Sequence, residues 1–122
     1  MSSLKKEHTI EERLELSMLY DFYGALLKEN QRRMFEASVL EDYNFSEIAQ
    51  DEGITRQGAY DTVKRAIKQL EMYEDKLGLV AKFREQKEMA KKLRDKLEGI
   101  QYSGSSVEWE EILQLLEKML EA

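Results

Sequence analysis

The chain has 122 residues, no proline, no cysteine and a net charge of −6. The lack of cysteine excludes disulfides and thiolate metal sites, and the lack of proline favours long helices. No apolar run approaches the ~18 residues that cross a bilayer, and the N-terminus has no apolar signal core. We therefore expect an all-α, cytoplasmic protein without membrane insertion, whose negative charge counts against strong non-specific DNA binding.

Residues 1–8 resemble a flexible leader, and we expect His8, the only histidine, to be exposed to solvent. A helix should begin after Thr9, because Glu12 follows it at the spacing of a capping box. Its apolar stripe comprises Leu14, Met18, Leu19, Phe22, Tyr23, Leu26 and Leu27. The aromatic residues in this helix could form a platform for base stacking, but Phe22 and Tyr23 share the stripe and fit a core position better.

A second helix is predicted from about Glu29 to Glu41, with Met34, Phe35 and Val39 on its buried face. The adjacent Arg32 and Arg33 are interpreted as solvated, and a phosphate contact is the alternative.

Residues 44–77 have the pattern of a helix-turn-helix motif. Asn44 and Glu47 have capping-box spacing, Gly53 is suited to end a short helix, Ile54 would plug the turn, and Thr55 would cap the second helix. The expected buried stripe of that second helix is Ala59, Val63, Ala66, Ile67, Leu70, Tyr73 and Leu77. An αα-hairpin with no role in nucleic-acid binding has the same pattern and stays open as an alternative.

The exposed face of the helix that begins after Thr55 is the candidate recognition surface. In helix-turn-helix proteins the first turns of the second helix enter the major groove, where Arg reads guanine and Gln reads adenine. The candidate nucleic-acid-binding residues are Thr55, Arg56, Gln57, Tyr60, Lys64, Arg65 and Lys68. Gly58 and Asp61 oppose this reading, since one loosens the first turn and the other would repel phosphates.

Two further helices are expected, at about residues 79–98 and 107–121. The first has one apolar side and a basic opposite side, which is either a solvated surface or a surface that binds RNA or protein. The segment 103–106 resembles a linker, and the last helix has a strong apolar stripe that includes Trp109, Leu113 and Leu116. We divide the chain into a helix-turn-helix helical domain, residues 1–102, and a linker with a docking or dimerisation helix, residues 103–122.

Charge is distributed unevenly along the chain. Residues 77–106 contain seven basic and four acidic residues, a charge of +3, and residues 107–122 contain one basic and five acidic residues, a charge of −4. These parts could neutralise each other in a homodimer, which we expect because most symmetric assemblies are two-fold. We find no phosphate-binding glycine loop, nucleophile motif or histidine cluster, so neither catalysis nor a metal or cofactor is expected.

The string SEIAQDEGITRQGAYD, residues 46–61, resembles region 4 of sigma-70-type factors, and the chain is more similar to the YlxM family of small bacterial proteins. The resemblance covers about residues 10–100 and includes Tyr20–Gly24 and Gln31-Arg32. It implies a sigma-70 region-4-like helix-turn-helix bundle with long C-terminal helices. It also implies an accessory role with the signal recognition particle and its GTPase. Tyr60 and Asp61 stand where sigma factors have base-reading residues, which favours a role other than promoter reading.

Two functions follow from these observations. The first is a non-catalytic accessory protein of the signal recognition particle that binds DNA or structured RNA, with the particle's GTPase as a protein partner. The second is a DNA-binding transcription regulator of the sigma-70 region-4 type, acting through Arg56, Gln57, Tyr60, Lys64 and Arg65.

Overall fold

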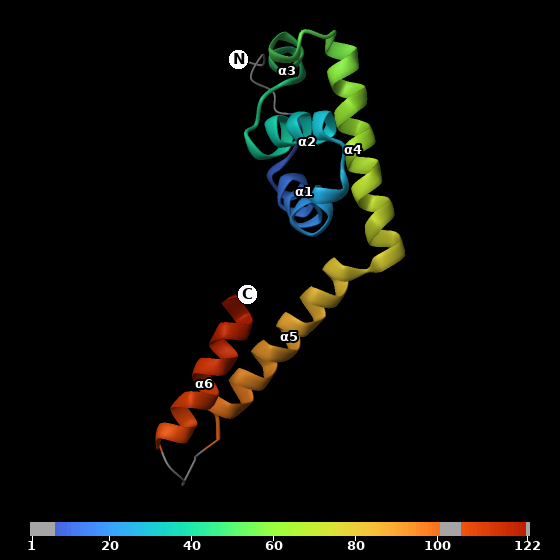
Figure 1. Ribbon diagram of the computed structural model, residues 1–122. Helices are drawn as coiled ribbons and strands as arrows, with labels where there is room; N and C mark the ends of the chain where they lie inside the picture. Colours follow the sequence, from blue (N-terminus) through green and yellow to red (C-terminus); the bar gives the residue numbers. More distant parts are fainter. Residues whose placement is uncertain (1–6, 101–105, 122) are drawn as a thin grey trace. The chain divides into compact units, whose positions relative to one another are not determined.

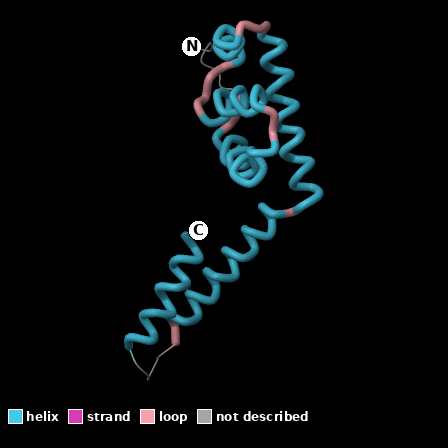
Figure 2. The backbone as a smooth tube through the Cα atoms, in the orientation of Figure 1, coloured by secondary structure: helices cyan, strands magenta, loops and turns pink. Residues whose placement is uncertain are grey.

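The computed structural model describes residues 7–100 and 106–121, and within these residues it is helical and contains no strand. The helices are α1 (Ile10–Tyr23), η2 (Gly24–Leu26), α2 (Glu29–Phe35), η3 (Glu36–Leu40), α3 (Phe45–Glu52), α4 (Arg56–Leu77), α5 (Leu79–Glu98) and α6 (Ser106–Glu121). Figures 1 and 2 show their order. The prediction of an all-α fold is therefore confirmed. No helix in the described ranges has both the length and the apolar character that a membrane crossing requires.

The chain divides into two compact units, Met1–Val80 and Ala81–Ala122. The first unit contains α1 to α4 and the first two residues of α5, and the second contains the rest of α5 and α6. The expected linker at 103–106 lies almost wholly outside the described residues, so the predicted boundary after residue 102 stays a prediction.

Two predicted capping boxes are present in the first unit. Thr9 accepts a hydrogen bond from the Glu12 amide at 3.1 Å, and the Glu12 carboxylate accepts one from the Thr9 amide at 2.8 Å. Asn44 and Glu47 form the same reciprocal pair, at 2.8 and 2.9 Å. These bonds satisfy amide groups that a helix N-terminus leaves without a backbone partner, so the sequence fixes where α1 and α3 begin.

Helix α4 runs along the other helices of the first unit and contributes to both of its apolar clusters. One cluster joins α1 to α4 through residues that include Leu16, Tyr23, Ala66 and Leu70. The other joins α2 and α3 to α4 and comprises Met34, Phe45, Ile48, Ala49, Ala59 and Val63. The buried positions of α4 recur at steps of three and four, so one stripe of this helix serves both clusters.

Several residues predicted to be buried are exposed instead: Leu14, Phe22, Leu26, Ile54 and Leu77. Phe22 and Leu26 each precede a buried residue, Tyr23 and Leu27, by one position. One residue rotates the side chain by ~100° around a helix axis, which takes these two side chains off the narrow buried stripe. Ile54 is 40% exposed and covers the first turn of α4 from outside.

A buried tyrosine holds the junction of α4 and α5. Gly78 ends α4 with a φ of 62°, a conformation that glycine adopts without steric cost. The Tyr23 hydroxyl donates a hydrogen bond to Glu74 Oε1 at 2.6 Å and accepts one from the Leu79 amide at 3.1 Å. Glu74 Oε1 also accepts from the Val80 amide at 3.0 Å, so α1 and α4 together cap the first turn of α5. Burial and the Glu74 carboxylate raise the pKa of Tyr23.

Candidate nucleic-acid interface

The helix-turn-helix motif is formed by α3, a turn at Gly53 and Ile54, and the N-terminal half of α4. Gly53 has a φ of 70°, and the Ile54 amide donates to the Ala49 carbonyl at 3.0 Å, which closes the end of α3. Thr55 then accepts a hydrogen bond from the Gly58 amide at 3.0 Å. Because Ala49 and Ala59 have small side chains and are both buried, α3 and α4 can pack closely at this crossing.

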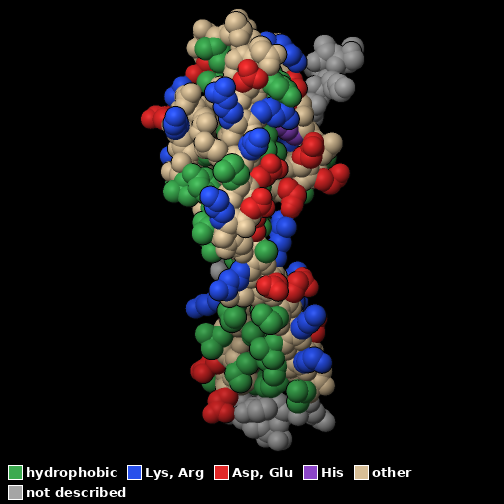
Figure 3. Space-filling model, turned by 90° about the vertical axis from the view of Figure 1, so that its right-hand side faces the viewer, with side chains coloured by type: hydrophobic (Ala, Val, Ile, Leu, Met, Phe, Trp, Pro, Cys, Tyr) green, Lys and Arg blue, Asp and Glu red, His purple; other side chains and the backbone are tan. Residues whose placement is uncertain are grey.

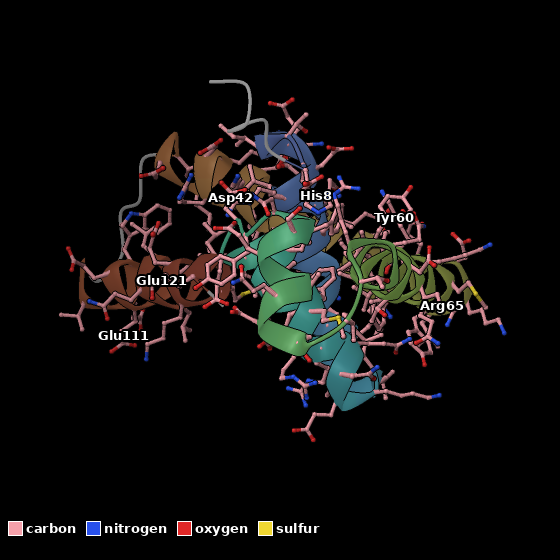
Figure 4. The ribbon with its side chains drawn as sticks, turned by 90° about the horizontal axis from the view of Figure 1, so that it is seen from above. His8, Asp42, Tyr60, Arg65, Glu111 and Glu121 are labelled. Carbon is pink, nitrogen blue, oxygen red and sulfur yellow. The ribbon has the colours of Figure 1, made fainter. Side chains whose placement is uncertain are left out.

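All seven candidate residues, Thr55, Arg56, Gln57, Tyr60, Lys64, Arg65 and Lys68, are exposed. They do not form one compact group, however. Figure 4 shows Tyr60 and Arg65 on different sides of α4, with Tyr60 on the side of His8. Gln57 donates a hydrogen bond to Asp61 at 2.9 Å, so the carboxylate that opposes phosphate binding lies within the candidate surface.

An aromatic pair supports the cations at the start of α4. The rings of Phe45 and Tyr60 meet edge to face at 5.3 Å. The Arg56 guanidinium lies 5.9 Å from the centre of the Phe45 ring, and the Lys64 ammonium lies 5.4 Å from that of Tyr60. Cation–π contacts of this kind restrict where a flexible side chain lies, so Arg56 and Lys64 are partly oriented before any ligand binds.

His8 is buried, which corrects the expectation that it is exposed. It is 5% exposed, its Nε2 lies 2.9 Å from Ser38 Oγ, and its ring meets Phe45 edge to face at 6.5 Å. Burial lowers the pKa of His8, and the nearby positive charge of Lys64 lowers it further. The neutral imidazole is therefore part of the support beneath Phe45 and Tyr60.

Sequence reasoning missed both His8 and Phe45 as supports of the candidate surface. Phe45 had a usable signal, since it follows the N-cap Asn44 and precedes buried Ile48 by three positions. No pattern in the sequence indicates that His8 is buried, because its partner Ser38 is 30 residues away and belongs to the irregular helical segment η3.

A groove of about 680 Å³ lies between α1 and α4, beside the candidate surface. Its lining residues are His8, Glu11, Glu12, Glu15, Leu16, Lys64, Ile67, Lys68 and Glu71. The space-filling view in Figure 3 shows the acidic side chains gathered next to the histidine. Four carboxylates thus share this groove with two candidate cations, and they weaken the positive potential that a phosphate backbone would meet there.

The Arg33 side chain, predicted to be solvated, is bound by an acidic residue. Arg33 donates two hydrogen bonds to the Glu52 carboxylate, at 2.8 and 3.0 Å, and so ties α2 to the end of α3. These hydrogen bonds lower the pKa of Glu52. Because Arg33 is about half exposed, the pair adds little to stability.

The described part of the chain contains no cluster of three or more histidine, aspartate or glutamate side chains suited to hold a metal ion. The exposed groups near the start of α4 are cations, an aromatic ring and an amide, with Phe45 of α3 beside them. Groups of these types can form hydrogen bonds to phosphates and base edges.

Residues 10–110 match the family model of UPF0122, whose description is "Putative helix-turn-helix protein, YlxM / p13 like". A UPF0122 protein of Caldanaerobacter subterraneus is 49% identical over 82 residues, which is 67% of this chain and 70% of the relative. A UPF0122 protein of Thermoanaerobacter sp. is 43% identical over 87% of this chain and 88% of its own length. UPF0122 protein YlxM of Bacillus subtilis is 38% identical over 91% of this chain and 96% of its own length. The chain belongs to the UPF0122 (YlxM/p13-like) family.

Proposed function

We propose that this member of the UPF0122 family is a nucleic-acid-binding accessory protein of the bacterial signal recognition particle pathway, with no catalytic role. The exposed polar face at the start of α4, presented by a capped helix-turn-helix, is the observation behind the proposal. The family relationship supports the helix-turn-helix, and the resemblance to YlxM proteins supplies the pathway. In this proposal the protein acts in the cytoplasm and as a homodimer.

Structured RNA fits the candidate surface better than duplex DNA. A helix in the major groove has phosphate backbones on both sides, and on the α1 side those phosphates would meet Glu11, Glu15 and Glu71. RNA loops offer unstacked bases and a single backbone, which can follow Arg56 and Tyr60 and reach Lys64, a lining residue of the acidic groove, from one side. An overall charge of −6 also favours a ligand that makes few phosphate contacts.

The direct test measures binding of the full chain to the signal recognition particle RNA and to duplex DNA of equal length at physiological salt. We expect the RNA to bind more tightly, and Lys64→Ala to weaken that binding because one phosphate contact is lost. The control is Lys76→Ala, which removes an equal charge from the exposed C-terminal end of α4. A failure of the wild-type chain to bind the RNA would refute the proposal.

The protein partner needs its own experiment. A tagged chain should retain the particle's GTPase when the RNA is present, and ribonuclease treatment distinguishes a contact through RNA from a direct protein contact. If the GTPase is retained neither with the RNA nor after ribonuclease treatment at physiological salt, the GTPase is not a partner of this protein.

A DNA-binding regulator of the sigma-70 region-4 type is the second candidate function. It is favoured by Arg56 and Gln57, which are exposed in the first turn of α4, where helix-turn-helix proteins read bases. A genome-wide footprint would show discrete promoter sites under this alternative, and Arg56→Ala would relax the sequence preference. A footprint without discrete sites would exclude it.

A further inference from the structure

The second unit has one seam at which its helices meet. Arg94 Nη1 lies 3.2 Å from Glu117 Oε1, and Lys87 Nζ donates to the Leu120 carbonyl, so positions rise on α5 as they fall on α6 and the helices are antiparallel. The less exposed residues form a seam at steps of three and four: Phe83, Lys87, Ala90, Arg94 and Leu97 on α5, and Trp109, Leu113, Leu116 and Leu120 on α6. The other described side chains of residues 81–100 and 107–121 are exposed.

A second stripe lies one residue before the seam on each helix: Lys82, Gln86, Met89, Leu93 and Lys96 on α5, and Glu108, Ile112, Leu115 and Met119 on α6. It is apolar at Met89 and Leu93 of α5 and from Ile112 onward on α6. Because the helices are antiparallel, a step of one residue in the same direction rotates both stripes toward the same side of the pair. This side, here named the bundle face, presents Met89, Leu93, Ile112, Leu115 and Met119, all exposed, and Met89 and Leu115 are each 62% exposed. Figure 3 shows hydrophobic side chains gathered on one side of this unit.

The opposite side of the pair is entirely polar. The residues one position after the seam are Arg84, Glu88, Lys91, Asp95 and Glu98 on α5, and Glu110, Gln114, Glu117 and Glu121 on α6. A helix with apolar residues on two adjacent stripes and polar residues elsewhere is typical of a bundle, in which each helix contacts two neighbours. Helix α6 has this pattern from Ile112 onward and α5 has it at Met89 and Leu93, so over this stretch the pair has the pattern of half a four-helix bundle.

The pair has little buried apolar surface of its own. Of its described residues beyond Val80, only Ala90 and Leu116 are buried. Single helices of 16 to 20 residues are marginal in water, and an exposed apolar face of this extent marks an interaction site. We therefore expect a partner on the bundle face.

Charge identifies the partner as a second copy. The α5 residues 81–98 contain seven basic and four acidic side chains, whereas α6 contains one basic and five acidic side chains. A two-fold axis parallel to the helices places each α5 on the other copy's α6. This arrangement pairs the net charge of +3 on α5 with the net charge of −4 on α6. An axis across the helices would place α5 on α5 and α6 on α6, where like charges repel.

The area of the bundle face suits this arrangement. A 16-residue helix is ~24 Å long, and two helices side by side span ~20 Å, so each copy offers roughly 500 Å² in projection. That is within a factor of two of the ~800 Å² that each partner contributes to a standard interface.

We propose that the second units of two copies form a four-helix bundle, in which the α5 of each copy packs on the α6 of the other through the bundle face. The register of the pair lies between those given by the Arg94–Glu117 and Lys87–Leu120 contacts, which brings Leu93 and Leu115 to about the same height in one copy, and the axis preserves height. Leu93 of one copy therefore lies on Leu115 of the other. This inference rests on the proposed homodimer but not on nucleic-acid binding.

The first test is the mass of the full chain in solution without nucleic acid, by light scattering after gel filtration. We expect twice the chain mass of 14.4 kDa. Leu115→Lys should weaken dimerisation at least ~100-fold, because it places an unpaired charge inside the bundle. Gln114→Lys adds the same charge to the adjacent residue on the polar side and should leave the dimer intact. A monomeric wild type, or a dimer that tolerates Leu115→Lys, would overturn the proposal.

Mixing experiments test which helices meet. Leu115→Lys mixed with Leu93→Glu should form a mixed dimer, since the new charges pair where α6 meets the other copy's α5. Leu115→Lys mixed with Leu115→Glu should stay monomeric, and a dimer in that mixture would overturn the arrangement. Circular dichroism must show that each variant has the helix content of the wild type. If Leu115→Lys has less helix than the wild type, Met119→Lys takes its place. Loss of RNA binding with an intact dimer would refute the proposed function alone.

Discussion

Removal of one hydroxyl group should loosen the junction between α4 and α5. The change Tyr23→Phe keeps the buried ring but removes the group that donates to Glu74 at 2.6 Å and accepts from the Leu79 amide at 3.1 Å. A hydrogen bond to a charged group contributes ~1.5–3 kcal/mol, and an amide left unpaired costs ~1–3 kcal/mol. Because the Val80 amide still binds Glu74, we expect a loss of about 2–4 kcal/mol in the free energy of unfolding.

Urea denaturation followed by circular dichroism measures this loss, and hydrogen exchange locates it. Leu79 and Val80 should lose amide protection, whereas the α3 amides should keep theirs. Tyr43→Phe is the matched control, since Tyr43 is exposed. This variant should change the free energy of unfolding by no more than ~0.5 kcal/mol. A Tyr23→Phe variant as stable as wild type, with unchanged protection at Leu79, would refute the role assigned to this hydroxyl.

Three further predictions concern the helix-turn-helix and its support. Gly53→Ala should cost about 1–2 kcal/mol, because Gly53 has a φ of 70°, and urea denaturation would detect it; a neutral change would contradict the turn geometry. Asn44→Ala should lower the free energy of unfolding by ~1 kcal/mol, because the Glu47 amide loses its cap. Urea denaturation measures this loss, and an unchanged midpoint would contradict the role of the cap. The pKa of His8 is lowered on folding, so the unfolded chain binds more protons below pH 6.5, and stability should fall as pH drops through that value. His8→Gln should remove this part of the pH dependence, and an unchanged pH profile would contradict the buried neutral imidazole.

The local rules of helix termini made the helix-turn-helix predictable. Asn44, Gly53 and Thr55 each satisfy a backbone requirement through their own side chain or conformation, so their positions in the sequence are sufficient. The exposed face of α4 followed from the same periodicity that identified its buried stripe. Local signals of this kind do not depend on what packs against the helix.

Features set by contacts between distant segments were not predictable. Leu14 and Phe22 fit a wide apolar stripe, but the helices packed on α1 cover only a narrow one, so both side chains are exposed. The His8–Ser38 contact joins segments 30 residues apart, and the acidic groove depends on α1 lying beside α4. In α5 and α6 the apolar positions were visible, but which of them form the seam depends on how the two helices pair.

The central claim is that the N-terminal half of α4 binds the phosphate backbone of RNA. Its most direct test is titration of the signal recognition particle RNA over a series of salt concentrations, with wild type and Lys64→Ala. We predict that the logarithm of the binding constant falls linearly with the logarithm of salt concentration, and that the slope of Lys64→Ala is smaller by about one phosphate contact. Equal slopes for the two proteins, or no binding by the wild type at physiological salt, would contradict the claim.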